Sequence, residues 1–250
     1  MILTMPARAK LNLDLRVIAR RDDGFHDLRT TFQAIDLHDL IEIGSDTETR
    51  FDCDGFDIDP EDNSVVQAHR AMEEATQRTL PVRIHLHKGI PPGSGMGGAS
   101  SDAAATLKAL STMFNLKTDL NAIAEKLGSD VSFFLLGGRA RAEGRGEKLV
   151  ALESTQTWFA VAWPGFGLST GDVYGAWDEA KGDGPNELRR AAEKVDPRLK
   201  DFAHKLGPGW QMTGSGSAFF KSTTSEKEAH EAIAGVDCWS AVAASVPRWS

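Results

Sequence analysis

A glycine-rich segment constrains the fold of this chain more than any other feature. Residues 91–103 read PPGSGMGGASSDA, and four of the six residues from Gly93 to Gly98 are glycines. Without Cβ atoms, backbone amides can approach a ligand closely. The strictly alternating segment Val82–His87 predicts a strand before the loop, and the Ala- and Leu-rich segment 100–114 predicts a helix after it. Unpaired amides and the helix dipole at such a helix start favour phosphate.

Two familiar nucleotide-binding loops, the Walker A loop and the dinucleotide-binding loop, are rich in glycine like this segment. A Walker A loop requires Lys and then Ser or Thr after its last glycine, but Ala99 and Ser100 stand there, which excludes it. The pattern Gly-x-Gly-x-x-Gly at 93–98 matches the dinucleotide fingerprint, and Asp119 lies at roughly the distance of its acidic residue. Asp119 is however expected to start a helix. The dinucleotide interpretation and a plain flexible connection both stay open at this point.

Composition limits the kinds of partner. The chain has 250 residues, 41% hydrophobic and 26% charged, which is ordinary for a globular protein. The formal net charge of −8 argues against nucleic-acid binding, so an anionic ligand would need locally placed positive groups. Apolar runs such as Trp158–Trp163 are too short to cross a bilayer, and the first residues lack the pattern of a signal peptide. These features predict a cytoplasmic protein with no membrane partner.

Neither cysteines nor histidines suggest a metal site in the sequence. Cys53 and Cys238 are isolated, with no CxxC pair, and are expected to be reduced thiols. His85 and His87 share one face of a predicted strand, but no third ligand is evident nearby. A structural role is therefore favoured for both histidines, and no protein-bound metal is predicted.

The remaining chain mixes strands and helices without regular alternation. Strands are predicted at 10–17, 28–35, 40–43, 82–87, 139–143, 148–152, 157–163, 210–213, 218–221 and 239–244. Helices are predicted at 63–78, 100–114, 119–127 and 171–180, from about 186 to 206, and at 225–234. This order favours an α+β fold over a doubly wound sheet. A domain boundary is expected near residues 150–156.

The whole loop resembles the phosphate-binding segment of the GHMP kinases, the superfamily of galactokinase, homoserine kinase and mevalonate kinase. That segment has the form Pro-x-Gly-x-Gly-Leu-Gly-(small)-(small)-Ser-Ser-Ala. This chain departs from it at Met96, which replaces the usual Leu, and at Asp102, which replaces a frequent Asn or Ala.

Other segments resemble one family within this superfamily, the 4-diphosphocytidyl-2-C-methyl-D-erythritol kinases. They occur in the same order as in that family: AKLNL at 9–13, RRDDGFHDL at 20–28, EDNS at 61–64, KGIP at 88–91, LGSDVSFF at 127–134, LST at 168–170, PNEL at 185–188 and MTGSGS at 212–217. The resemblance covers nearly the whole chain and is strongest up to residue 140.

The resemblance implies a GHMP kinase-like two-domain fold. It implies a mixed-sheet, ATP-binding N-terminal domain at 1–153, a ferredoxin-like C-terminal domain at 154–250, and an active site in the cleft between them. It further implies ATP with Mg²⁺, a small-molecule substrate derived from cytidine diphosphate, and a monomer or homodimer. The implied reaction is phosphorylation of the substrate's 2-hydroxyl in the non-mevalonate isoprenoid route.

The resemblance also assigns candidate site residues. Lys10 and Asp130 are placed at the reacting centre, where a carboxylate beside an ammonium stays ionised and can accept the hydroxyl proton; a solvated strand end and a turn or cap carboxylate are the alternatives. The expected ATP contacts are Asn63, Ser64, Lys88, Pro91, Pro92, Gly93, Ser94, Gly95, Met96, Gly97, Gly98, Ala99, Ser100 and Ser101. The expected substrate contacts are Asn12, Phe25, His26, Thr170, Gly214 and Ser215. Phe25 can stack on cytosine and His26 can hydrogen-bond to its edge.

Two other functions are compatible with the sequence. The chain could be another GHMP kinase, acting on homoserine, mevalonate or a sugar, although the Phe25-His26 pair and the Arg20-Arg21 turn speak against this. It could also be a non-catalytic nucleotide-binding relative, although both Lys10 and Asp130 are retained.

Overall fold

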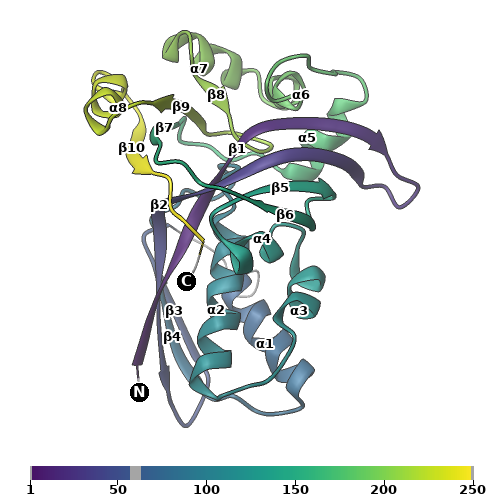
Figure 1. The fold of residues 1–250 in the computed structure, drawn as a ribbon, viewed down its shortest axis with the longest axis vertical. Helices are drawn as coiled ribbons and strands as arrows, with labels where there is room; N and C mark the ends of the chain where they lie inside the picture. The colour runs from purple at the N-terminus through teal and green to yellow at the C-terminus, as the bar shows by residue number, and fades with distance from the viewer. Residues whose placement is uncertain (1, 57–62, 249–250) are drawn as a thin grey trace. The chain divides into compact units, whose positions relative to one another are not determined.

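The computed structural model describes residues 2–56 and 63–248, which fall into two compact units (Figure 1). The first unit comprises residues 1–9, 38–90 and 97–136, and the second comprises 10–37, 91–96 and 137–250, apart from the undescribed positions. Strands β1 (Ile2–Arg20) and β2 (His26–Ser45) contribute residues to both units. Glu61 and Asp62, which belong to one of the motifs above, lie outside the described residues.

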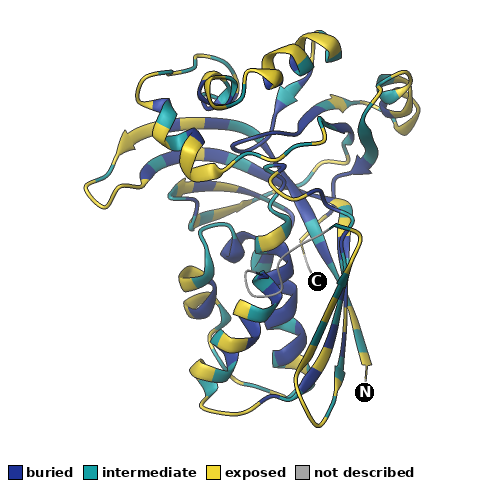
Figure 2. Ribbon diagram, turned by 180° about the vertical axis from the view of Figure 1, so that it is seen from behind, coloured by how far each residue is buried: buried dark blue, intermediate teal, exposed yellow. Residues whose placement is uncertain are grey.

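The first unit pairs a small sheet with four helices. Strand β4 (Val82–His87) runs parallel to β3 (Arg50–Asp54) and antiparallel to the part of β2 around Glu42. The helices are α1 (Ser64–Thr76), α2 (Gly98–Met113), α3 (Leu120–Leu127) and α4 (Val131–Leu136). In β4 buried and more exposed residues alternate, as a strand with one buried face requires (Figure 2). Helices α1 and α2 lie on one side of β3 and β4 (Figure 1).

The second unit contains a four-stranded antiparallel sheet with the order β10-β7-β9-β8. Its strands are β7 (Trp158–Trp163), β8 (Gln211–Met212), β9 (Phe219–Thr223) and β10 (Trp239–Ala244). Its helices are α5 (Thr170–Trp177), α6 (Arg189–Val195), α7 (Arg198–Leu206) and α8 (Glu226–Ile233). Helices between β7 and β8, and α8 between β9 and β10, give the βαββαβ order of a ferredoxin-like fold.

The early part of β2, in the second unit, continues the six-stranded sheet that has the order β3-β4-β2-β5-β6, with β1 also pairing with β2. Residues 28–33 of β2 pair with β5 (Arg139–Gly144), which in turn pairs with β6 (Lys148–Leu152). A core of buried side chains, including Leu15, Trp177, Leu188 and Phe219, joins β1 to the helices and the four-stranded sheet of this unit.

The structure departs from the predicted elements at several places; the strand predicted at 10–17, for example, extends over Ile2–Arg20 as β1. Strands predicted at 28–35 and 40–43 form the single strand β2, because the polar residues around Asp36 continue in extended conformation. Strand β3 was not predicted, although its five residues alternate charged and apolar side chains, because it is short and contains two aspartates, which are depleted in strands. The last helix before β8 is two helices, because Pro197, the N-cap residue of α7, disfavours helical backbone at Asp196.

Cys53 and Cys238 are free thiols, as expected. In the described residues, no helix combines the length and the apolar character that crossing a membrane requires. The compact units are discontinuous in sequence, so the boundary between 1–153 and 154–250 stays a prediction.

Candidate active site

The first part of the glycine-rich loop, residues 91–96, is held by backbone hydrogen bonds within the second unit. The amides of Leu168 and Ser217 donate to the Gly93 carbonyl at 3.0 and 3.3 Å, and the Ala218 amide donates to the Ser94 carbonyl at 2.9 Å. Gly95 has φ of +79°, and a Cβ there would lie 2.9 Å from the Gly216 oxygen and even closer to that of Thr213. Only glycine fits this position without displacement of backbone.

Lys10 is buried beside this loop. Its ammonium donates to Asn12 Oδ1 at 2.5 Å and to the Gly95 carbonyl at 2.9 Å, and its amide donates to the Met96 carbonyl at 2.9 Å. A Cβ on Gly214 would lie 3.2 Å from Lys10 Nζ. The structure therefore brings together five residues that the sequence assigned separately to catalysis, ATP and substrate. The alternative of a solvated strand end for Lys10 is wrong, since the exposure of Lys10 is 3%.

Asn12 links this group to the neighbouring strands. Its amide donates to Thr213 Oγ1 at 2.9 Å, and its side-chain NH₂ donates to Thr30 Oγ1 at 2.8 Å. Asn186, which the sequence analysis gave no role, donates 2.8 Å hydrogen bonds to the carbonyls of Met212 and Gly214 and so fixes the turn between β8 and β9. The PNEL motif at 185–188 marked Asn186 as a residue shared with the family. It did not indicate the contacts of Asn186, because both carbonyls lie more than twenty residues away in the sequence.

Helix α5 connects the β8–β9 turn to His26. Thr170, at its start, shares a 3.0 Å hydrogen bond with Ser215. One turn later on the same helix face, Tyr174 stacks on the His26 ring at 5.2 Å between centroids, and Trp177 meets that ring edge-on at 5.7 Å. Thr170 and Tyr174 are four residues apart, which places their Cα atoms about 6 Å apart along the axis.

His26 and Phe25 have different surroundings. His26 is buried, and its Nε2 atom has no hydrogen-bond partner among the described residues, with Asp178 Oδ1 3.8 Å away. Phe25 is 52% exposed, and the Arg145 guanidinium lies 4.9 Å above its ring. An exposed aromatic next to a buried polar atom without a partner is compatible with a ligand, but the substrate contacts of both residues stay predictions.

In the first unit, helix α2 begins directly after the glycine-rich loop without a side-chain cap. Its N-cap residue is Gly97, whereas the side chains of Asn63, Asp119, Ser169 and Ser225 cap helices α1, α3, α5 and α8. The first amides of α2, from Gly98 to Ser100, have no acceptor within the helix. A sixteen-residue helix with an open start is suited to an anion.

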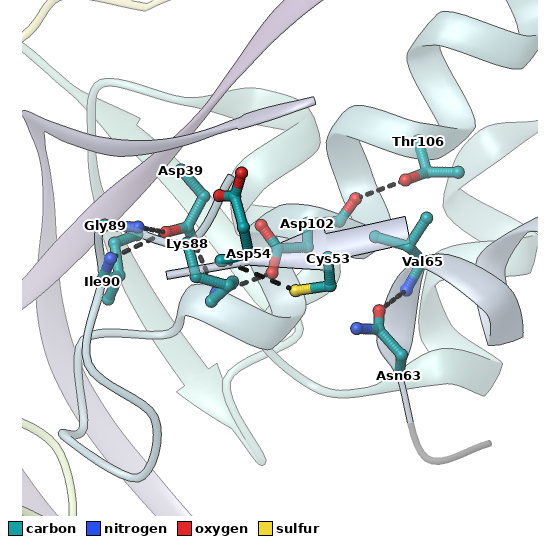
Figure 3. Close-up of polar contacts among 10 residues, drawn as sticks. All are labelled: Asp39, Cys53, Asp54, Asn63, Val65, Lys88, Gly89, Ile90, Asp102 and Thr106. Carbon is teal, nitrogen blue, oxygen red and sulfur yellow. Dashed lines mark hydrogen bonds and ion pairs between the residues drawn. The ribbon is translucent and has the colours of Figure 1, made fainter. Parts of the chain in front are cut away.

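Behind this helix start lies a buried ionic group of Lys88, Asp39 and Asp102 (Figure 3). The Lys88 ammonium pairs with Asp39 Oδ2 and, at 2.8 Å, with Asp102 Oδ2. Asp39 Oδ1 also accepts from the amides of Gly89 and Ile90 at 2.6 and 2.7 Å, which holds the entry to the loop. A direct contact of Lys88 with phosphate stays a prediction. It would require Lys88 to break its ion pair with Asp39 or with Asp102.

The charges of this group perturb one another. Burial, together with the nearby charge of Asp39, raises the pKa of Asp102 well above its usual value, although Lys88 acts against this. Burial opposes the charge of Lys88, but attraction to Asp102 and Asp39 outweighs it and raises the pKa of Lys88. Asp102, which departs from the GHMP pattern, is thus explained as a partner of Lys88.

The remaining predicted residues of the first unit lie at helix starts. Asn63 Oδ1 accepts from the Val65 amide at 2.9 Å and caps α1, and Ser64 is the first residue of that helix (Figure 3). Asp130 precedes α4, and its carbonyl accepts from the Phe133 amide at 3.1 Å. Because Lys10 belongs to the second unit and Asp130 to the first, their pairing stays a prediction.

Known proteins resemble this chain over most of its length. The family described as GHMP kinases N terminal domain matches residues 63–138. A 4-diphosphocytidyl-2-C-methyl-D-erythritol kinase from Chromohalobacter salexigens is 37% identical over 253 residues, which cover 91% of this chain and 85% of the relative. The same-named kinase from Delftia acidovorans is 38% identical, covering 88% and 86%.

Solved structures agree with the sequence relatives. A crystal structure of 4-(cytidine 5'-diphospho)-2C-methyl-D-erythritol kinase has a TM-score of 0.83 at 34% identity, covering 97% of this chain and 99% of that one. Homoserine kinase from Cytophaga hutchinsonii, at 17% identity and a TM-score of 0.64, shares the fold and covers 99% and 95%. The predicted α+β GHMP kinase fold is confirmed, and the chain belongs to the 4-diphosphocytidyl-2-C-methyl-D-erythritol kinase family of the GHMP kinases.

Proposed function

We propose that this chain transfers the γ-phosphoryl group of ATP to the 2-hydroxyl of 4-diphosphocytidyl-2-C-methyl-D-erythritol. The observation that carries the proposal is the buried group around Lys10, in which an ammonium, the Gly95 carbonyl and the Gly214 turn meet. Its neighbours are the residues that the family resemblance assigns to phosphate and substrate. The identity to named relatives, 33–38% over about nine-tenths of the chain, supports the choice of acceptor.

The triphosphate is proposed to bind at the loop and the open start of α2. Backbone amides from Gly98 to Ser100 supply partial positive charge without a basic side chain, as the acidic composition of the chain requires. The hydroxyl groups of Ser100 and Ser101 are the polar side chains of this helix start, and Ser101 is buried. Asn63 and Ser64, at the start of α1, are proposed to line the adenine pocket.

The start of α2 offers few side chains that could bind Mg²⁺ directly. Asp102 is directed to Lys88, so hydroxyl oxygens of Ser100 or Ser101 are the proposed protein contacts, with phosphate and water oxygens as the others. When bound, the ion neutralises charge on the phosphates.

Lys10 and Asp130 are proposed to act on the reacting groups. Asp130 accepts the proton of the acceptor hydroxyl as its oxygen forms a bond to the γ-phosphorus, and the bond from that phosphorus to the β-phosphate oxygen breaks to release ADP. Lys10 offsets the negative charge on the moving phosphoryl group, and its hydrogen bonds to Asn12 and Gly95 hold the ammonium in one position.

Residues around α5 are proposed to recognise the acceptor. Thr170 and Asn12 orient the methylerythritol part, and Ser215 is positioned by its hydrogen bond to Thr170. His26, held between Tyr174 and Trp177, has a buried nitrogen available for the edge of cytosine, and Phe25 offers an exposed ring for stacking.

Release of ADP measured with a panel of alcohols tests the proposal. We expect turnover with the cytidyl substrate and none with mevalonate or homoserine. Turnover of mevalonate or homoserine without the cytidyl compound would assign the chain to another GHMP activity. Binding of ATP without turnover of any alcohol would make it a nucleotide-binding relative.

Replacing the proposed base provides a sharper test. Asp130→Asn is expected to lower kcat by roughly 10²–10⁴-fold, the usual range for loss of a general base, with ATP affinity little changed. Asp119→Asn is the matched control, because Asp119 caps α3 and asparagine caps helices as well as aspartate. A near-normal rate for Asp130→Asn, measured by steady-state kinetics, would remove Asp130 from this role.

A further inference from the structure

Three metal-ligating side chains gather on the more exposed face of β3 and β4 in the first unit. Asp54, His85 and His87 each offer one ligand atom, and these atoms all lie within 4.8 Å of one another. Asp54 Oδ2 is 3.1 Å from His85 Nε2 and 3.0 Å from His87 Nδ1. We propose that Asp54, His85 and His87 bind one divalent transition-metal ion of the zinc class.

The strand register creates this arrangement. His85 and His87 are two residues apart on β4 and therefore lie on the same face, and their rings stack with centroids 4.2 Å apart. In the parallel pairing of β3 with β4, Asp54 lies directly opposite His87. The Lys88 amide donates to the Asp54 carbonyl at 3.0 Å and fixes the end of β3 against β4. The ligands are thus set by paired strands rather than by a loop.

The distances suit a tetrahedral ion. Bonds of about 2.0–2.2 Å from zinc to His nitrogen and carboxylate oxygen place neighbouring ligand atoms about 3.3 Å apart, close to the two His–Asp separations in this cluster. Two imidazoles and one carboxylate leave a fourth position for water. Their side chains are 38%, 38% and 57% exposed, so an ion can enter from solvent.

A fourth side chain supports the orientation of one ligand. Because His87 directs Nδ1 to Asp54, its Nε2 atom is directed to the opposite side, where Glu42 Oε2 lies 4.0 Å away on β2. Metal-bound histidines commonly donate their second ring N–H to such a carboxylate, which fixes the tautomer. At 4.0 Å the two atoms lie within ion-pair distance but beyond hydrogen-bond distance, so Glu42 is assigned a positioning role beside His87 and is not a ligand.

The cluster uses none of the residues proposed for catalysis. Its two histidines lie on the face of β4 opposite to the buried side chains of Val82, Ile84 and Leu86. Lys88, which follows His87, is buried in the ionic group with Asp39 and Asp102. Binding of the ion links β3 to β4 and is expected to stabilise the folded chain by mass action.

Isothermal titration of the full, tag-free chain with Zn²⁺, after removal of metal with a chelator and without nucleotide, tests the proposal. We expect one ion per chain and a higher Tm in excess Zn²⁺. Asp54→Asn and the double change His85→Ala with His87→Ala should abolish this binding, whereas Glu42→Gln should weaken it by roughly tenfold. Co²⁺ in the same site should give the visible absorption of a tetrahedral ion.

Two control variants separate this site from other binding. His230→Ala removes an exposed histidine with its Nε2 3.8 Å from Glu226 and should change nothing. Cys53→Ser removes the thiol next to Asp54 in the chain and should also leave binding intact. The proposal is overturned if the parent chain binds no ion, if folded Asp54→Asn binds as the parent does, or if only Cys53→Ser loses binding.

Discussion

His26 is a buried side chain whose outer nitrogen lacks a hydrogen bond within the described chain. Such an atom usually costs free energy unless a ligand or water supplies a partner. Tyr174 and Trp177 hold the ring in place, so its position does not depend on a ligand. The residue is therefore preorganised for a contact that the described part of the chain does not make.

From this environment we predict that His26→Ala raises the KM for the cytidyl substrate and leaves the KM for ATP unchanged, because only the acceptor side loses a partner. Steady-state kinetics with each substrate varied in turn provide the measurement. Tyr174→Phe is the control, because it keeps the ring that stacks on His26. An unchanged KM for the acceptor would contradict the assignment of His26.

Asp102 gives a prediction about pH. Its pKa is raised by burial, so the folded state binds this proton more tightly than the unfolded state does. The resulting stabilisation is fully present below the ordinary value of 3.8 and is lost as pH rises through the raised folded value. Asp102→Asn removes this contribution.

The unfolding free energy of Asp102→Asn is therefore expected to rise more steeply with pH than that of the parent, from about pH 4 upward. Urea unfolding at a series of pH values measures both curves. The stabilisation from the raised pKa of Lys88 is fully present below its ordinary value of 10.5 and is lost only above it, so it does not change over this pH range. Parallel curves would show that Asp102 titrates normally.

At the scale of elements, the glycine-rich loop depends on close backbone approach. Gly95→Ala is expected to lower the unfolding free energy by at least about 3 kcal/mol, because φ is positive and the new Cβ meets backbone oxygens of the β8–β9 turn. Gly165→Ala has a similar φ of +86° with nothing within 4 Å of the Cβ, and should cost only about 1 kcal/mol. Equal losses in urea unfolding would mean that the contact is unimportant.

The same loop shows what local sequence could predict. Strand β4, the glycines and helix α2 follow one another within about thirty residues, and each carries its own periodicity, so all three were predicted. Asp39, Asn186 and Asp54 acquire their partners through strand pairing and turns far away in sequence. No local pattern identifies them, which is why Asp54 could not be predicted as a neighbour of His85 and His87.

At the scale of the whole molecule, neither compact unit is continuous in sequence, and β1 and β2 each provide residues to both. When one unit unfolds, its part of β1 and β2 no longer supports the part of these strands that lies in the other unit. We therefore predict one cooperative unfolding transition.

Two spectroscopic signals can test this prediction, because the tryptophans that the structure describes all belong to the second unit, whereas helices occur in both units. Tryptophan fluorescence and far-UV circular dichroism should give the same urea midpoint. Two distinct midpoints would show that the units unfold separately.

The interlaced order of the segments has a consequence for folding during synthesis. The amides of Ala244 and Val246 donate to the Asp36 side chain and the Ala34 carbonyl, so the second unit is completed only by residues more than two hundred positions later. The first unit contains no residue beyond 136. A nascent chain on the ribosome thus carries the early half of β2 without its last partners, and chaperones would encounter this strand edge before translation is finished.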